Sequence, residues 1–232
     1  MRKIIVVTGG SRGIGRAIIE KFATAGFDII TCGRDEGELA KLKAALAKST
    51  SVLYTTADMS VKSQAKQFTD FVVSLGRPVD VLVNNAGFFV PGEITTEPDG
   101  TLESMIEANL YSAYYTTRGI VPLMKQRKAG HVFNMCSIAS IQAYSNGGSY
   151  AISKFAMLGF SKCLREEMKE HGVRVTAVMP GATRTRSWDG ADLPEERFMK
   201  VEDIAETIYA AWSLSARSVV EEIIIRPQLG DI

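Results

Sequence analysis

Residues 3–15 read KIIVVTGGSRGIG and contain the pattern that decides the fold. A run of Ile and Val ends at Thr8, glycines follow at positions 9, 13 and 15, and an amphipathic stretch begins at Gly13. This order predicts a buried strand, a tight turn and a helix. Glycines allow the backbone to approach a pyrophosphate, and a helix N-terminus offers free N–H groups to that anion. The stretch therefore predicts a nucleotide-binding turn, although Gly-x-x-x-Gly-x-Gly differs from the commoner fingerprint.

The rest of the chain continues this alternation of strand and helix. Apolar runs predict strands at residues 3–8, 28–32, 52–56, 79–83, 130–136, 173–178 and 220–225. Amphipathic stretches predict helices at about residues 13–25, 36–48, 61–75, 101–128, 149–171 and 201–214. Near-continuous apolar strands between helices require a parallel sheet covered on both faces. We therefore expect an α/β fold of the Rossmann type: a doubly wound parallel sheet of about seven strands, with helices on both faces and ligands at the carboxyl ends of the strands.

Composition narrows the class of protein. The chain has 232 residues, 46% of them hydrophobic, and no Pro/Gly/Ser-rich linker or block of charge divides it, so we expect one domain over residues 1–232. A net charge of +1 favours a small molecule or a second copy as partner over nucleic acid or a membrane. No apolar run is long enough for a membrane span or a signal peptide. We interpret Cys32, Cys136 and Cys163 as buried free thiols in a reducing cytoplasm.

Tyr150 and Lys154 are spaced by four residues, and Ser137 lies thirteen residues before the tyrosine. Tyrosine is a poor acid or base at neutral pH, because its ordinary pKa is about 10. A lysine one helical turn away places a positive charge near the phenol and favours its ionised form. A tyrosine on a helix more often simply packs, so this pair predicts a hydride-transfer site only together with the glycine-rich turn.

The end of the second predicted strand bears on the choice of dinucleotide. An acidic residue there binds the ribose 2′-hydroxyl of NAD, whereas an arginine pairs with the 2′-phosphate of NADP. Here the sequence is Cys32-Gly33-Arg34-Asp35, with Gly33 where the acid is expected, and Arg12 can reach the same phosphate. Two guanidinium groups predict NADP(H). Asp35 is the counter-argument, but its position before Glu36 suits a helix N-cap.

At these residues the chain resembles the short-chain dehydrogenase/reductase family over nearly its whole length. The resemblance implies that Asp58, after the third strand, contacts the adenine, that residues 84–87 (Asn-Asn-Ala-Gly) close the fourth strand, and that residues 180–185 grip the nicotinamide end. The implied cofactor site comprises Thr8, Gly9, Ser11, Arg12, Gly13, Ile14, Gly15, Arg34, Asp58, Met59, Asn85, Ala86, Gly87, Tyr150, Lys154, Pro180, Gly181, Thr183 and Thr185.

The same resemblance implies a catalytic set of Asn109, Ser137, Tyr150 and Lys154. Tyr150 would donate a proton to the carbonyl oxygen, and Ser137 would hydrogen-bond the same oxygen. Lys154 would hold the nicotinamide ribose and lower the pKa of Tyr150, while Asn109 would interrupt its helix and hold a water. The alternatives are that Ser137 caps a strand end and that Asn109 bonds backbone. We assign no metal site, and we interpret His131 and His171 as structural.

Inference about the substrate rests on fewer residues. The resemblance places specificity in the loop at about residues 184–200. Together with Phe88, Phe89, Tyr144 and Met179, that loop could line a partly aromatic pocket through Trp188, Phe198 and Met199. The tail at residues 219–232 resembles that of bacterial sepiapterin-reductase-like members of the family. One hypothesis is that the tail folds near the pocket and that Asp231 anchors a polar heterocycle.

The sequence therefore predicts an NADPH-dependent carbonyl reductase acting on a small ketone or aldehyde. The alternatives are a pterin carbonyl reductase, a 3-oxoacyl-carrier reductase and a non-catalytic NADP(H)-binding sensor. The resemblance also implies a homodimer or homotetramer built through the helices at residues 101–128 and 149–171. Apolar side chains on these helices support such an interface, namely Tyr114, Phe155, Leu158, Phe160 and Leu164.

Overall fold

The computed structural model describes residues 2–190 and 192–232, so Met1 of the predicted domain and Ala191 of the predicted loop lie outside the described residues. The strands are β1 (Ile4–Thr8), β2 (Asp28–Gly33), β3 (Val52–Thr56), β4 (Val81–Asn84), β5 (Gly130–Met135), β6 (Val173–Pro180) and β7 (Glu222–Ile225). The α-helices are α1 (Gly13–Thr24), α2 (Glu36–Leu46), α3 (Lys62–Ser74), α4 (Thr101–Ile106), α5 (Ser112–Arg127), α6 (Gly148–Met168) and α7 (Val201–Ser213).

Within the described residues, the strands form one parallel seven-stranded sheet in the order β3-β2-β1-β4-β5-β6-β7. The predicted doubly wound fold is therefore confirmed. The order reverses between β1 and β4, because the chain crosses from one half of the sheet to the other after β3. In such a sheet, ligands bind beyond the carboxyl ends of the strands at this reversal.

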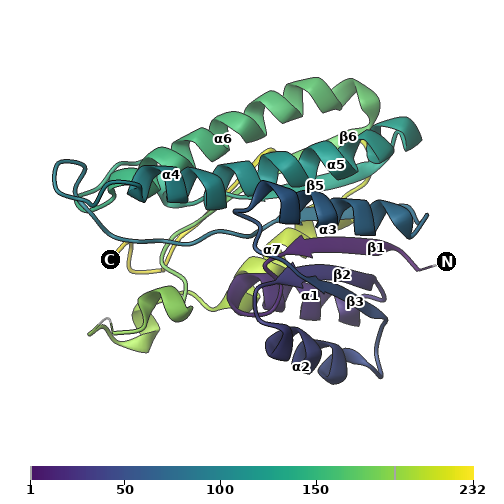
Figure 1. Ribbon diagram of the computed structural model, residues 1–232, viewed down its shortest axis with the longest axis horizontal. Helices are drawn as coiled ribbons and strands as arrows, with labels where there is room; N and C mark the ends of the chain where they lie inside the picture. The colour runs from purple at the N-terminus through teal and green to yellow at the C-terminus, as the bar shows by residue number, and fades with distance from the viewer. Residues whose placement is uncertain (1, 191) are drawn as a thin grey trace.

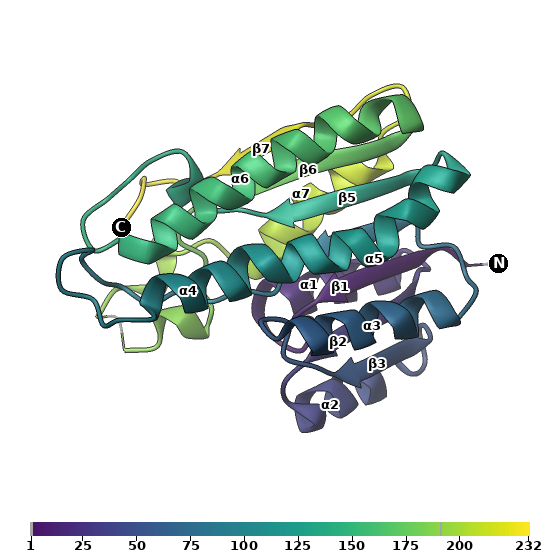
Figure 2. The same ribbon diagram turned by 45° about the horizontal axis from the view of Figure 1, so that its top comes forward.

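Helices cover both faces of the sheet, as Figures 1 and 2 show, with α1, α2 and α7 on one side and α3, α5 and α6 on the other. Strand β1 explains this arrangement, because all five of its residues are buried. Ile5 and Val7 join the core formed with α1 and α7, whereas Ile4 and Val6 join the core formed with α3 and α5. Burying one such side chain contributes about 1.5–3 kcal/mol, so both helical layers are needed to hold the strand in place.

The carboxyl edge of the sheet carries a long loop between β6 and α7. Its ends are joined by a bridge between Thr183 and Met199, and it contains 3₁₀ turns at Arg186–Trp188 and Glu195–Arg197. In Figure 1 this loop and the C-terminus lie at the same end of the molecule. The loop and the tail can therefore border a common site.

Three predictions about burial need correction or qualification. Cys32 and Cys136 are buried, but Cys163 is exposed because it lies on the face of α6 that turns away from the sheet; all three are free thiols. On the same helix, Leu158 and Leu164 are buried within the chain's own core and are not available to a partner.

None of the helices in the described part of the chain has the length and hydropathy of a membrane span.

Candidate active site

A cavity of about 1130 Å³ opens at the carboxyl ends of the strands. Its walls come from segments far apart in the sequence: the glycine-rich turn, the ends of β2 to β6, the start of α6, and the last two residues. Most of the predicted site residues line it, namely Gly9, Ser11, Arg12, Gly13, Ile14, Gly15, Arg34, Asp58, Met59, Asn85, Ala86, Gly87, Ser137, Tyr150, Lys154, Pro180, Gly181, Thr183 and Thr185. Thr8 and Asn109 do not line it.

The glycine-rich turn has the geometry of an anion cradle. Gly13 has a φ of 53°, which favours glycine, and a Cβ on Gly15 would lie 2.4 Å from the carbonyl oxygen of Gly9. Helix α1 has neither a side-chain N-cap bond nor an acidic residue in its first turn. Its first N–H groups are therefore available to a phosphate, so the residues present fit a bound dinucleotide.

Thr8 and Asn85 hold this turn against β4. The Thr8 hydroxyl oxygen accepts hydrogen bonds from the backbone N–H groups of Asn85 and Ala86, both at 3.0 Å. The Asn85 side chain donates to the carbonyl oxygens of Thr8 and Gly9, at 2.9 and 3.0 Å. Thr8 was predicted to contact the cofactor, but it stands behind the cavity wall because its hydroxyl joins two strands.

Two arginines near the end of β2 differ in their surroundings. Arg12 is held by Asp35, with 2.5 Å between Nη2 and Oδ2. Asp35 also caps α2 by accepting from the backbone N–H of Glu38 at 3.1 Å, which confirms its predicted structural role. Arg34 is exposed and lines the cavity. Asp58 lines the cavity as well, and its Oδ1 accepts from the backbone and the hydroxyl of Ser60.

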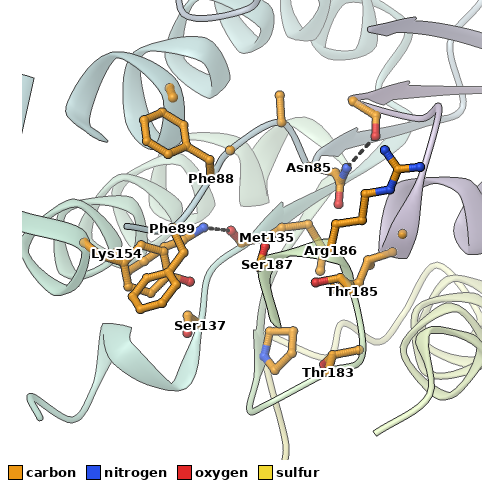
Figure 3. A pocket seen from close by; sticks show the side chains of 18 of the residues that line it. Asn85, Phe88, Phe89, Met135, Ser137, Lys154, Thr183, Thr185, Arg186 and Ser187 are labelled. Carbon is orange, nitrogen blue, oxygen red and sulfur yellow. Dashed lines mark hydrogen bonds between the residues drawn. The ribbon is translucent and has the colours of Figure 1, made fainter. Parts of the chain in front are cut away.

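Ser137, Tyr150 and Lys154 converge on the same cavity, as Figure 3 shows for Ser137 and Lys154. The Ser137 oxygen accepts from the backbone N–H of Ala139 at 3.2 Å, so Ser137 caps the 3₁₀ turn Ile138–Ser140 that follows β5 and also lines the cavity. A serine that accepts in this way keeps its own hydrogen for donation. The Tyr150 ring packs edge-on against Phe89, with 4.8 Å between centroids. These contacts orient the two hydroxyl groups while leaving both able to donate.

The electrostatics of this trio differ from the prediction. Burial raises the pKa of Tyr150 above its ordinary value, and a hydrogen bond with Ser137 opposes that shift only in part. Burial also lowers the pKa of Lys154 to about 8. Nζ of Lys154 donates to the carbonyl oxygen of Met135 at 2.9 Å and lies 5.7 Å from the Tyr150 ring centroid. The expected net lowering of the Tyr150 pKa is therefore not seen in this arrangement, where burial outweighs the opposing hydrogen bond.

Asn109 interrupts its helix, as predicted, because residues Glu107–Tyr111 form a π-helical turn between α4 and α5. Its side chain is fully engaged behind the cavity. Nδ2 donates to the carbonyl oxygen of Phe88 at 3.1 Å and to the Ser153 hydroxyl at 2.9 Å, and Oδ1 accepts from the N–H of Phe88 at 2.9 Å. This arrangement matches the alternative in which Asn109 bonds backbone, and it ties the loop after β4 to α6.

The substrate end of the cavity is partly aromatic. Phe88, Phe89, Tyr144 and Trp188 line it. Three other residues predicted to line the pocket do not: Met179, Phe198 and Met199. They are buried instead, because Met179 packs beneath α6 and residues 198 and 199 close the base of the loop. Within the described residues, no group of His, Cys, Asp and Glu side chains is arranged to hold a metal.

The C-terminal tail reaches this cavity, which confirms the predicted position of the tail. Asp231 and Ile232 line it, and Arg226 holds the Asp231 carboxylate at 2.6 Å. Arg226 also donates to Gln142 at 3.3 Å. No local pattern in the sequence signals this network, because Gln142 lies 84 residues before Arg226. Several other lining residues were not predicted individually, namely Gln142, Ser145, Asn146, Arg186 and Ser187, of which the last two lie in the predicted loop at residues 184–200.

The parallel sheet, the uncapped helix N-terminus and the Ser-Tyr-Lys trio together define a dinucleotide-dependent oxidoreductase. A model of the short chain dehydrogenase family matches residues 3–195. The chain therefore belongs to the short-chain dehydrogenase/reductase family. It is an NAD(P)-binding oxidoreductase that acts on CH–OH and carbonyl groups.

Individual relatives align over the full length. Sepiapterin reductase of Chlorobaculum tepidum is 32% identical over 241 residues, covering 100% of this chain and 99% of that protein. An alcohol dehydrogenase from the archaeon Thermococcus sibiricus, complexed with 5-hydroxy-NADP, has a TM-score of 0.92 at 27% identity, covering 98% of this chain and 97% of that one. L-Sorbose reductase of Gluconobacter frateurii, complexed with NADPH and L-sorbose, has a TM-score of 0.88 at 27% identity, with coverages of 97% and 95%.

Proposed function

We propose that this protein is an NADPH-dependent carbonyl reductase that converts a small ketone or aldehyde to the alcohol. The observation that carries the proposal is the convergence of Ser137, Tyr150 and Lys154 on a cavity that also contains the glycine-rich turn. A binding module needs the turn but has no use for the trio. The free thiols of the chain suit a reducing compartment such as the cytoplasm.

In the proposed mechanism, reduced nicotinamide supplies the hydride when the dinucleotide is bound. Tyr150 donates its phenolic proton to the carbonyl oxygen, and its raised pKa means that the phenol enters the reaction protonated. Ser137 donates a second hydrogen bond to the same oxygen and stabilises the charge that develops there. Lys154, whose pKa is lowered to about 8 by burial and which is charged below that pH, would hold the ribose hydroxyls beside the tyrosine.

The first test compares Tyr150→Phe with the wild type on a panel of ketones and aldehydes, by following the loss of NADPH absorbance. We expect the rate to fall by about 10²–10⁴-fold, the range found when a general acid is removed. NADPH affinity should change little, and the exposed Tyr111→Phe serves as a matched control. NADPH binding without turnover in the wild type would favour the sensor instead. Equal activity in Tyr150→Phe would contradict the mechanism.

The preference for NADPH rests on Arg34. It lies directly after β2, where no carboxylate occupies position 33, and it is exposed to the cavity. The two complexed structures compared above hold 5-hydroxy-NADP and NADPH. Arg34→Ala should weaken NADPH by about tenfold and leave NADH unchanged, because only NADPH carries the 2′-phosphate. Arg217→Ala removes an exposed arginine outside the cavity and is the matched control. Equal losses for both cofactors would contradict this assignment.

A pterin carbonyl is the second candidate substrate, and the position of Asp231 favours it. The carboxylate lies in the cavity and is fixed by Arg226, so it could accept hydrogen bonds from a polar heterocycle. We propose that the loop at residues 184–200 and the tail together set specificity. If this is right, Asp231→Asn should raise KM for a pterin ketone about tenfold while sparing a simple aliphatic ketone. An unchanged KM for the pterin would remove this candidate.

A 3-oxoacyl-carrier reductase remains the third candidate, since it uses the same trio. The nearly neutral net charge gives no general attraction for an acidic carrier protein. Comparing a free 3-oxoacyl thioester with the same group on an acidic carrier distinguishes this function. A large preference for the carrier-bound form would support it, whereas equal rates would leave a small-molecule reductase.

We also propose that the protein assembles with copies of itself through α4, α5 and α6. These helices lie beside each other in Figures 1 and 2, and their outer faces expose Tyr111, Tyr114, Ile152 and Phe155. Such aromatic clusters are typical of interfaces. Phe155→Glu should reduce the mass measured by light scattering, while Leu214→Glu, at the end of α7, should not. A wild type that runs as a monomer would contradict the proposal.

A further inference from the structure

Two arginines at the cavity have no partner of their own. Four cationic side chains line it: Arg12, Arg34, Lys154 and Arg186. Arg12 is paired with Asp35, and Lys154 donates to a backbone carbonyl. Within residues 2–190 and 192–232, no side-chain hydrogen bond or ion pair engages Arg34 or Arg186. NADP(H) likewise brings two separate anionic groups, the 2′-phosphate and the pyrophosphate.

The backbone places Arg186 beside the glycine-rich turn. Thr185 precedes it, and a Cβ added to Gly13 would lie 3.4 Å from Cγ2 of Thr185. The start of the 3₁₀ turn Arg186–Trp188 therefore rests on the N-terminus of α1. Hydrogen bonds from Arg184 to Met199 and from Met199 to Ala182, both at 2.9 Å, fix the base of this loop.

The side chain of Arg186 also points toward a residue that holds the glycine-rich turn. In Figure 3 it extends toward Asn85, whose amide is bonded to the carbonyl oxygens of Thr8 and Gly9. Arg34, by contrast, directly follows β2 and lines the cavity from that strand. The two free guanidinium groups therefore reach the cavity from different elements, Arg34 from the end of β2 and Arg186 from the loop after β6.

We propose that Arg186 binds the pyrophosphate of the dinucleotide and so holds the 3₁₀ turn Arg186–Trp188 against the cofactor. A guanidinium can bond two phosphate oxygens at once, and it would neutralise charge that the N–H groups of α1 only partly offset. Trp188 belongs to the same 3₁₀ turn and lines the substrate end of the cavity. Cofactor binding would thereby fix one aromatic wall of the substrate site. This inference rests on the proposed dinucleotide site.

The test is a calorimetric titration of Arg186→Ala with NADPH and with NADH. We expect both affinities to fall by the same factor, about tenfold or about 1.4 kcal/mol, because both cofactors carry the pyrophosphate. Arg34→Ala should lose affinity for NADPH alone. Adenosine 2′-monophosphate, which has the 2′-phosphate without a pyrophosphate, should bind Arg186→Ala and the wild type equally in competition experiments.

Controls separate this contact from other effects. Arg186→Lys keeps the positive charge but lacks the paired N–H donors of a guanidinium, so its affinity for both cofactors should lie between those of the wild type and the alanine variant. Arg217→Ala should bind both cofactors like the wild type. Because Arg186 is exposed, its removal should leave the thermal unfolding temperature unchanged. Unchanged affinity in Arg186→Ala, or a loss confined to NADPH, would overturn the assignment. A wild type that binds neither cofactor would refute the proposed function itself.

The position of Trp188 has its own readout. Trp188 fluorescence should be quenched by saturating NADPH in the wild type and less so in Arg186→Ala, and Trp188→Phe identifies the signal that comes from this tryptophan. Equal quenching in both proteins at saturation would show that Arg186 does not position the loop, and would overturn that part of the inference.

Discussion

At the scale of single residues, burial governs the proposed chemistry of the trio more than mutual charge does. Tyr150 and Lys154 are both removed from water, so the phenol holds its proton more firmly and the ammonium less firmly than usual. The first effect keeps the phenol protonated but makes it a weaker acid, and the second limits the charge that Lys154 can offer to a ribose. The spacing of the pair indicated proximity, but only the packed structure gives the direction of each shift.

The pH profile should therefore report Lys154. Below pH 8 its ammonium is charged, so we expect kcat/KM for NADPH to be flat there and to fall tenfold per unit at higher pH. Tyr150 stays protonated across this range because its pKa is raised. Lys154→Arg should lower the plateau and move the fall to higher pH, while exposed Lys48→Ala should keep the wild-type profile. A wild-type profile that stays flat beyond pH 9.5 would contradict this account.

Residue identity predicted local roles better than long-range partners. The N-cap at Asp35 follows from its place before Glu36, and the structure confirms it. The pairing of Asp35 with Arg12 has no such local signal, because the two are 23 residues apart. It depends on how the glycine-rich turn and the end of β2 meet. As a result, Arg12 is engaged by a carboxylate and Arg34 is the freer candidate for the 2′-phosphate.

At the scale of elements, periodicity predicted each strand and the main helices to within a few residues. The differences have physical reasons. Strand β6 continues two residues further than predicted, to Pro180, because it pairs with β7 as far as Ile225. The predicted strand at residues 220–225 begins only at Glu222. The 3₁₀ turns of the loop after β6 escaped prediction, because short turns that pack on a distant surface have no periodicity of their own.

The π-helical turn offers a test at this scale. Asn109→Leu keeps the number and branching of the side-chain heavy atoms but leaves the N–H and carbonyl groups of Phe88 without their partners, which costs up to about 1–3 kcal/mol for each group that water cannot reach. Because Phe89 packs on Tyr150, we also expect kcat to fall. Urea unfolding and steady-state rates measure both effects. Ser153→Ala spares both bonds to Phe88 and should be milder; equal effects of the two variants would argue against the tie through Phe88.

At the scale of the whole molecule, the pH dependence of stability should reflect a buried histidine of β5 that contacts the neighbouring strand β6. His131 is fully buried, lies 2.8 Å from the Thr176 hydroxyl through Nε2, and stacks on Phe133. Burial, aided by the charge of Arg174, lowers the pKa of His131 to about 2. The sequence-based reading of His131 as structural agrees with this environment, in which the ring stays neutral.

The free energy of unfolding should therefore decrease as the pH is lowered below about 6.5, the ordinary pKa of histidine. In that range the unfolded chain takes up a proton at His131 while the folded chain does not, so stability is lost by at most about 1.4 kcal/mol per pH unit. Urea unfolding at pH 7 and pH 5 measures the difference. In His131→Gln this part of the loss should disappear, whereas His171→Gln, which alters the other histidine in the 3₁₀ turn after α6, should retain it. Parallel losses in wild type and His131→Gln would show that acid sensitivity arises elsewhere, in carboxylates that are paired in the folded chain.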